Sequence, residues 1–175
     1  MSMRAFIATA CVMTAQLSLA AAADCPLAPN GQWAQTVLDK STEYGSTGWS
    51  ASQVLGPCDT LTYGDQQTSW APQEMNRDKR EFITVGFANP VHATGAIIRE
   101  TYGNGFLNTV EAVDAAGNYH QVWKGTDEPT RAINDFRVEW PRTDFVVVAL
   151  RVIISTDRND TEWEEIDSVQ LLGEP

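Results

Sequence analysis

The sequence is poor in histidine and in positive charge. Its 175 residues include only 2 His and 12 Lys or Arg, against 23 Asp or Glu, so the formal net charge is −11 at pH 7. This excess of negative charge argues against nucleic acid or an anionic membrane as a partner. The chain also contains no H-E-x-x-H, G-x-S-x-G or P-loop pattern, and neither His92 nor His120 belongs to a catalytic motif. We therefore expect no enzyme, although carboxylates from two different loops could still form a hydrolase site.

The N-terminus lacks the long apolar run that a transmembrane helix needs. One positive charge, Arg4, precedes a largely apolar stretch at residues 5–19, and four alanines follow at residues 20–23. This pattern is typical of a cleaved export signal, and it is too short and too polar to span a bilayer stably. We predict a signal peptide at residues 1–23, a single domain at residues 24–175, and a secreted or periplasmic protein. A weak membrane anchor is the alternative.

Cysteine is scarce as well. Of three cysteines, Cys11 lies in the predicted signal, which leaves Cys25 and Cys58 in the exported chain. Two cysteines in an oxidising compartment usually pair, and we predict a disulfide between them. The alternative is a catalytic thiol, but no nucleophile motif surrounds Cys58.

Long amphipathic helical stretches are missing, and short runs rich in Val, Ile, Phe and Thr alternate with Gly, Pro, Asn and Asp. This punctuation predicts an all-β protein, an antiparallel eight-stranded jelly-roll β-sandwich. Ile83 and Val85 should share the buried face of one strand with Phe87. The predicted strands cover residues 33–38, 81–87, 93–101, 109–114, 119–123, 136–140, 145–154 and 165–172.

The predicted connections alternate in length. The second, fourth and sixth are tight, at residues 89–90, 115–118 and 141–144. The others are longer and richer in polar and aromatic residues. Because successive antiparallel strands reverse direction, the four elaborate loops should share one end of the sandwich, and binding residues concentrate on such loops. These loops cover residues 39–80, 102–108, 124–135 and 155–164.

Five segments carry a likeness to a known superfamily, at residues 49–60, 63–72, 81–83, 100–102 and 163–173. Over residues 36–173 the chain resembles the galactose-binding-like β-sandwiches, and most closely the domain that precedes the leucine-rich repeats of a mitochondrial F-box protein. It is more distantly similar to discoidin and coagulation factor V/VIII type C domains. The resemblance implies a non-catalytic binding module, with carbohydrate as its expected ligand. A protein-interaction or envelope-structural domain is the alternative. Cys58 departs from the small residue or proline expected there.

The resemblance also implies a structural calcium ion between the first long loop and the last strand. The matching positions are Asp59, Asp65, Thr68 and Glu165. Calcium prefers several oxygen ligands, which these side chains and a glycine-bearing loop offer. The alternative is that Asp59 and Asp65 only cap turns.

Two loops offer aromatic and hydrogen-bonding groups for a ligand. Tyr102, Asn104 and Phe106 follow one strand, and Asp157, Arg158 and Trp163 follow another that runs the same way. We predict that Tyr102, Asn104, Arg158 and Trp163 line one shallow sugar pocket. Alternatively, the aromatic residues plug the end of the core. The other tryptophans, Trp33, Trp49, Trp70, Trp123 and Trp140, are expected to pack in the core or within loops.

Overall fold

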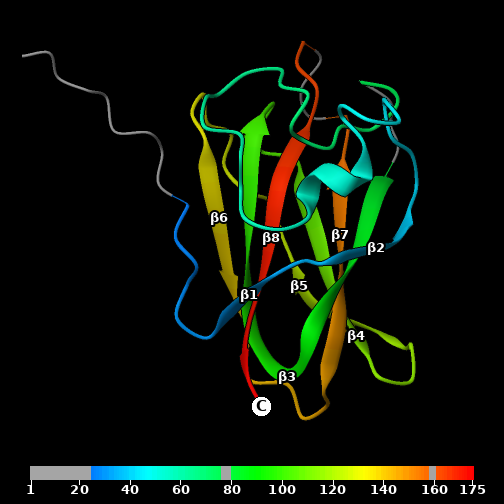
Figure 1. Cartoon of the computed structure of the whole chain (residues 1–175), viewed down its shortest axis with the longest axis vertical. Helices are drawn as coiled ribbons and strands as arrows, with labels where there is room; N and C mark the ends of the chain where they lie inside the picture. The colour runs from blue at the N-terminus through cyan, green and yellow to red at the C-terminus, as the bar shows by residue number, and fades with distance from the viewer. Residues whose placement is uncertain (1–24, 76–79, 158–160) are drawn as a thin grey trace, which may run out of the picture.

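The computed structural model describes residues 25–75, 80–157 and 161–175, in which eight antiparallel strands form two layers (Figure 1). The predicted signal at residues 1–23 and the predicted ligand residue Arg158 lie outside the described residues. One short 3-10 helix, η1 (Ala51–Val54), interrupts the first long loop. The strands are β1 (Gly31–Trp33), β2 (Thr36–Lys40), β3 (Arg80–Tyr102), β4 (Leu107–Asp114), β5 (Tyr119–Lys124), β6 (Asn134–Glu139), β7 (Val147–Ser155) and β8 (Glu165–Glu174).

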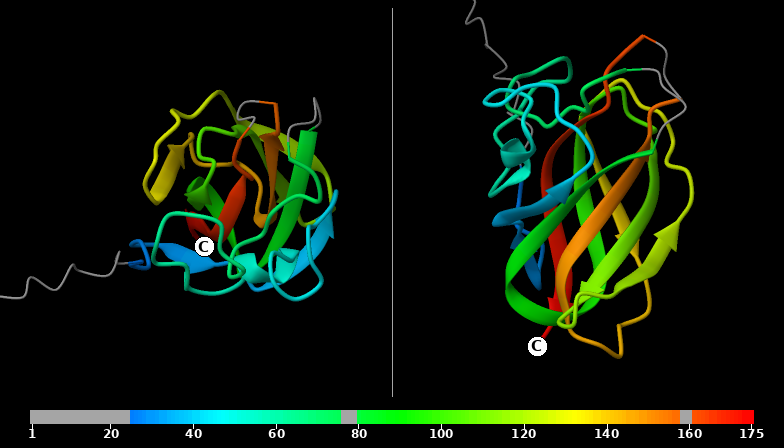
Figure 2. Two further views of the ribbon diagram at one scale, coloured as in Figure 1. Left: turned by 90° about the horizontal axis from the view of Figure 1, so that it is seen from above. Right: turned by 90° about the vertical axis from the view of Figure 1, so that its right-hand side faces the viewer.

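Strand β3 belongs to both layers. Its first half pairs with β2 and β7, and its second half pairs with β8 and β6. Between the halves the register shifts from Gly86 to Val91, and the strand bends at the lower end of the molecule (Figure 2). One layer therefore has the order β1-β8-β3-β6 and the other β2-β3-β7-β4-β5. The predicted all-β antiparallel sandwich is confirmed.

Two strand boundaries differ from the predicted ones. The strand expected at residues 33–38 is two strands, because the Ala34 N–H donates to Val169 of β8 whereas the Gln35 N–H donates to Gly86 of β3. The chain thus changes layers between these two residues. In contrast, the strands expected at residues 81–87 and 93–101 are the two halves of β3, with Pro90 exposed at the bend. Proline lacks a backbone donor and is tolerated in a strand at such a bend.

The core lies between the layers. Ile83 and Val85 are fully buried and Phe87 packs against the core, as the alternation predicted. Strand β7 lies between β3 and β4, and on its outer face the Arg151 guanidinium stacks 4.2 Å from the ring centroids of both Phe82 and Tyr119. The apolar side chains that fill the centre include Ile98, Val110, Leu150, Val152, Ile154, Val169 and Leu171.

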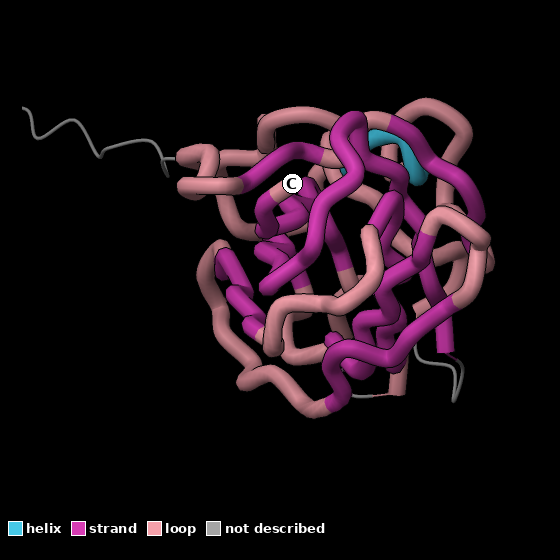
Figure 3. Tube along the Cα trace, turned by 90° about the horizontal axis from the view of Figure 1, so that it is seen from below, coloured by secondary structure: helices cyan, strands magenta, loops and turns pink. Residues whose placement is uncertain are grey.

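The described parts of the four elaborate loops lie together at one end of the sandwich, as the alternation of loop lengths predicted (Figure 1). The C-terminus and the bend of β3 lie at the other end, which Figure 3 views. A disulfide joins Cys25 to Cys58, with a Cα–Cα distance of 6.1 Å, and confirms the predicted pairing. It fastens the first described residue to the first long loop. We call the end with the four loops the loop end.

Candidate functional site

The first long loop is fixed against the start of β8 by a buried tryptophan. The Trp70 N–H donates to the Ile166 oxygen at 2.8 Å, and the Ile166 N–H donates back to the Trp70 oxygen at 3.0 Å. The indole Nε1 of Trp70 donates to the Thr42 oxygen at 3.0 Å. Because Trp70 is fully buried, these bonds are shielded from water, and they hold the residues before Trp70 next to Glu165.

Trp49 has a backbone conformation that bulky residues rarely adopt. Its φ is 53°, in the left-handed region, where a Cβ crowds the backbone. Two bonds maintain this conformation: the Trp49 N–H donates to the Gln67 oxygen at 2.9 Å, and the Ala71 N–H donates to the Trp49 oxygen at 3.3 Å. The indole Nε1 then donates to Asp65 Oδ1 at 2.8 Å. Strain of this kind concentrates at functional sites.

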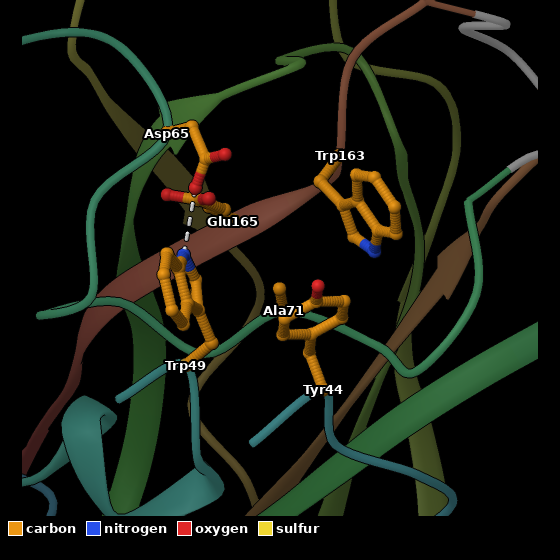
Figure 4. Close-up of a pocket in the computed structure, with 6 residues that line it drawn as sticks. All are labelled: Tyr44, Trp49, Asp65, Ala71, Trp163 and Glu165. Carbon is orange, nitrogen blue, oxygen red and sulfur yellow. Dashed lines mark hydrogen bonds between the residues drawn. The ribbon is translucent and has the colours of Figure 1, made fainter. Parts of the chain in front are cut away.

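A small pocket opens at the loop end between three aromatic side chains. The Tyr44 ring packs edge-to-face against Trp49 on one side and Trp163 on the other, with ring centroids 5.5 and 5.4 Å apart. Asp65 and Glu165 bring two carboxyl groups beside the Trp49 indole (Figure 4). The cavity volume is about 80 Å³, and Tyr44 is 54% exposed. We call this site, lined by Tyr44, Trp49, Asp65, Ala71, Trp163 and Glu165, the aromatic pocket.

The two carboxyl groups of the aromatic pocket interact strongly. Glu165 is fully buried, and its Oε2 accepts the Gln66 N–H at 3.2 Å. No group donates to its Oε1, and the Asp65 carboxyl lies beside it, within bonding reach only if one of the two is protonated. Burial, with the nearby Asp65 charge, raises the pKa of Glu165 to about 9. The pair therefore favours a proton or a cation between its members.

The structure divides the predicted calcium ligands. Asp65 and Glu165 meet in the aromatic pocket. The Asp59 N–H instead donates to Asp167 Oδ1 at 3.4 Å, and the Asp59 carboxylate raises the pKa of Asp167 along with burial. The Thr68 hydroxyl lies 2.6 Å from the Thr60 hydroxyl. Within the described parts of the chain, no group of three or more His, Cys, Asp or Glu side chains is arranged to hold a metal.

The two loops predicted to share a ligand are neighbours. Gly103 has a φ of +59°, and a Cβ built there would lie 2.4 Å from the Trp163 backbone oxygen. Only glycine permits this approach. The adjacency predicted from strand direction is therefore confirmed.

The described side chains of these two loops, however, do not line one pocket. Phe106 is fully buried in the core, so its predicted contact with ligand is wrong. Tyr102 packs against Tyr63 with ring centroids 5.6 Å apart, and Asn104 lines a different cavity. Asp157 is exposed in the turn that follows β7. Of the set, Trp163 reaches the aromatic pocket, where its Nε1 donates to the Pro72 oxygen at 2.9 Å.

Two aromatic residues of the aromatic pocket are not predicted as site residues by the sequence. The sequence predicts a packing role for Trp49 and no role for Tyr44. A usable signal exists: residues 44–49 read Tyr-Gly-Ser-Thr-Gly-Trp, which repeats the arrangement of aromatic residues around glycines at residues 102–106. In both segments the glycines allow close approach of backbone to neighbouring groups.

Comparison with known proteins identifies a family. The family model described as pappalysin-1, SD scarf domain, C-terminal matches residues 28–175. No curated protein matches the chain. In the described part of the structure, no helix is both long and apolar enough to cross a membrane.

Solved structures share the fold at low sequence identity. A chitosan-binding module of the chitosanase/glucanase from Paenibacillus sp. IK-5 has 13% identity and a TM-score of 0.57, over 79% of this chain and 94% of that one. A family 32 carbohydrate-binding module from Clostridium perfringens NanJ, solved with galactose, has 12% identity and a TM-score of 0.59, over 81% and 98%. Allantoicase from Saccharomyces cerevisiae has 15% identity and a TM-score of 0.56, over 78% of this chain but 39% of that one. These likenesses support the galactose-binding-like fold.

Proposed function

The chain belongs to the family of the C-terminal SD scarf domain of pappalysin-1, and we propose that it is a non-catalytic module that binds a carbohydrate in the aromatic pocket. The observation that supports this most is the convergence of Tyr44, Trp49 and Trp163 around two carboxyl groups at the loop end. Small-molecule sites combine apolar walls with a few polar groups in this way. Aromatic faces stack against the apolar face of a sugar ring, while carboxyl oxygens accept hydrogen bonds from its hydroxyls. Several structural neighbours are carbohydrate-binding modules.

The geometry of the carboxyl groups favours binding over hydrolysis. A glycosidase needs two carboxyl groups roughly 5 to 10 Å apart, with the scissile bond or a water between them. Asp65 and Glu165 instead lie within hydrogen-bonding reach of one another. No sugar linkage fits between groups in such contact, so this pair supplies affinity rather than catalysis.

Of the four predicted calcium ligands, we propose that Asp65 and Glu165 alone bind the ion. Oε1 of Glu165 is buried without a donor, and both side chains offer the hard oxygen ligands that calcium prefers. A bound ion would neutralise the pair and fasten the first long loop to β8. Calcium should then raise the melting temperature, since a ligand of the folded state alone stabilises it. The Asp65→Asn variant should show a smaller rise than the wild type, and an unchanged rise would exclude this pair.

Export is the remaining part of the proposal. The sequence pattern at residues 1–23 supports export. The likeness to the domain of a mitochondrial F-box protein is a separate point and stays a prediction. Expression with the natural N-terminus in a bacterial host should yield an exported protein whose first residue is Asp24. Retention of Met1 in the cell fraction would contradict the proposal.

A glycan array tests the ligand. The exported protein should be screened with and without calcium, alongside a Trp163→Ala variant and a Leu61→Ala control. Leu61 is an exposed apolar residue outside the aromatic pocket. Binding of a glycan class by the wild type and the control, but not by Trp163→Ala, would support the assignment. Absence of binding to every glycan would favour the protein-interaction alternative.

A further inference from the structure

A second cavity at the loop end contains buried oxygen atoms without hydrogen-bond donors. It has a volume of about 710 Å³, and its lining residues belong to the loops after β3 and β5 and to the loop before β8. Its lining includes Asn104, Gly105, Asp127, Thr130, Arg131 and Glu162. We call it the amide cavity. It shares no lining residue with the aromatic pocket.

Asp127 is the most unusual residue of the amide cavity. It is only 2% exposed, yet neither of its carboxyl oxygens has a hydrogen-bond partner. The exposed side chain of Arg131 lines the same cavity but gives Asp127 no hydrogen bond. A buried carboxylate is strongly unfavourable unless a counter-charge or a donor accompanies it.

Asn104, which lines the same cavity, supplies a second buried oxygen acceptor. It is 4% exposed, and its Nδ2 donates to Thr130 Oγ1 and to the Ala132 oxygen, each at 2.8 Å. The Thr130 hydroxyl itself donates to Ala132, at 3.0 Å, so both atoms facing Nδ2 act as acceptors. A flipped amide would place Oδ1 against them, which fixes the orientation of the side chain. Oδ1 is left without a donor.

Glu100 supplies a third such oxygen. It is fully buried at the end of β3, and its Oε2 accepts from Asn134 Nδ2 at 2.7 Å. Its Oε1 has no donor, and the Asp127 carboxyl lies within bonding reach of the Glu100 carboxyl. Two ionised carboxylates in this position repel one another unless a positive charge lies between them.

We propose that Glu100, Asp127 and Asn104 bind a divalent cation, calcium, where Asp127 and Asn104 line the amide cavity. The donor set consists of oxygen atoms only, which selects hard cations over zinc or copper. Calcium accepts mixed carboxylate and amide ligands in flexible geometry, whereas magnesium needs a near-ideal octahedron and retains its waters. The volume of the cavity leaves room for water to complete the coordination. The ion would tie the loop after β5 to the end of β3.

Calcium titration by isothermal calorimetry tests the proposal on the full exported chain. The Asp127→Asn variant should bind calcium at this site about tenfold more weakly or worse, because ligand charge sets calcium affinity. Glu128→Gln is the matched control, since it removes the same charge from an exposed neighbour on the same loop. It should bind as the wild type does. Magnesium should bind more weakly than calcium.

Variants of the aromatic pocket distinguish calcium binding in the amide cavity from calcium binding at Asp65 and Glu165. A chain carrying Asp65→Asn and Glu165→Gln should retain one calcium, and adding Asp127→Asn should abolish it. If Asp127→Asn does not fold, Glu100→Gln added to the chain carrying Asp65→Asn and Glu165→Gln provides the same readout, measured as loss of the calcium-induced rise in melting temperature. Two results would overturn the proposal: wild-type affinity in the Asp127 and Glu100 variants, or no calcium binding by the wild type up to about 10 mM, above the range of extracellular calcium modules. Absence of calcium binding by the wild type would mean that a shared proton, and not a cation, lies between Glu100 and Asp127.

Discussion

The indole of Trp49 donates a hydrogen bond to Asp65 Oδ1 at 2.8 Å, and this contact links the strained turn of the first long loop to the carboxyl pair of the aromatic pocket. Asp65 in turn faces Glu165, the first residue of β8. A single side chain thus orients one carboxyl group of the pocket through a backbone conformation that is itself unfavourable.

Trp49 should reveal its backbone strain when it is replaced. Both Trp49→Ala and Trp49→Gly remove the indole and its bond to Asp65. Only alanine retains a Cβ at a φ of 53°, so Trp49→Ala should be less stable than Trp49→Gly by about 1 kcal/mol. Urea unfolding of both variants measures the difference. Equal stabilities would show that the loop relaxes out of the left-handed conformation.

Tyr44 should contribute to binding more than to folding. Its ring forms one wall of the aromatic pocket and is 54% exposed. Tyr44→Ala should weaken sugar binding by about 1 to 3 kcal/mol, or roughly 5- to 150-fold in Kd. The melting temperature should change little. Titration with the glycan identified on the array measures the loss, and Leu61→Ala, which removes an exposed apolar side chain elsewhere, should bind normally.

The disulfide should account for a sizeable part of the stability. Cys25 and Cys58 are separated by 33 positions, and closing a loop of this length restricts the unfolded chain. The double variant Cys25→Ser, Cys58→Ser should lose about 3 to 4 kcal/mol of unfolding free energy. Urea unfolding of the variant and of the oxidised wild type provides the comparison. A loss below about 1 kcal/mol would mean that the unfolded chain is already compact.

The metal-free protein should lose stability as the pH rises. Burial raises the pKa of Glu164 to about 8 and those of Glu100 and Glu165 to about 9. Each carboxyl therefore holds its proton more tightly in the folded state than in the unfolded state, where the ordinary value is about 4.5. Their contribution to the free energy of unfolding is complete below about pH 4 and is lost as the pH rises through 8 to 9. Unfolding in chelator at pH 5 and at pH 9 measures the decline.

Glu164→Gln isolates one of these groups. Glu164 is fully buried and neither of its carboxyl oxygens has a donor. The variant should be more stable than the wild type at pH 9 and should decline less between pH 5 and pH 9. The exposed Glu128→Gln should follow the wild-type curve. Identical slopes for wild type and Glu164→Gln would show that this carboxyl is solvated when ionised.

Gly103 should tolerate a Cβ poorly. In addition to its φ of +59°, an alanine there would meet the Trp163 oxygen at 2.4 Å. Gly117 is the matched control, because its φ is +85° but a Cβ would meet nothing within 4 Å. Gly117→Ala should cost about 1 kcal/mol for the left-handed backbone alone, and Gly103→Ala should cost clearly more. Thermal unfolding of both variants separates the clash from the conformational cost.

The sequence by itself determined the all-β class, the position of most strand segments, the disulfide and the loop end. Alternation along residues 81–87 identified the buried face, because side chains in a strand change sides at each residue whatever surrounds them. Cys25 and Cys58 were predicted to pair because they are the two cysteines outside the predicted signal. The shared position of the four long loops was predicted because successive antiparallel strands reverse direction. Each of these rests on a local pattern or on counting.

Only the tertiary structure decided which loop side chains share a site. Phe106 turns into the core and Trp49 turns out of it, because loop backbone angles are set by bonds to distant residues such as Gln67 and Ala71. No periodicity in the sequence encodes such bonds. The same holds for the two carboxyl pairs. Asp65 of the first long loop lies beside Glu165 of β8, and Glu100 of β3 lies beside Asp127 of the loop after β5. These pairs exist because packing of the two layers brings those segments together, and their chemistry depends on burial that the folded chain alone provides.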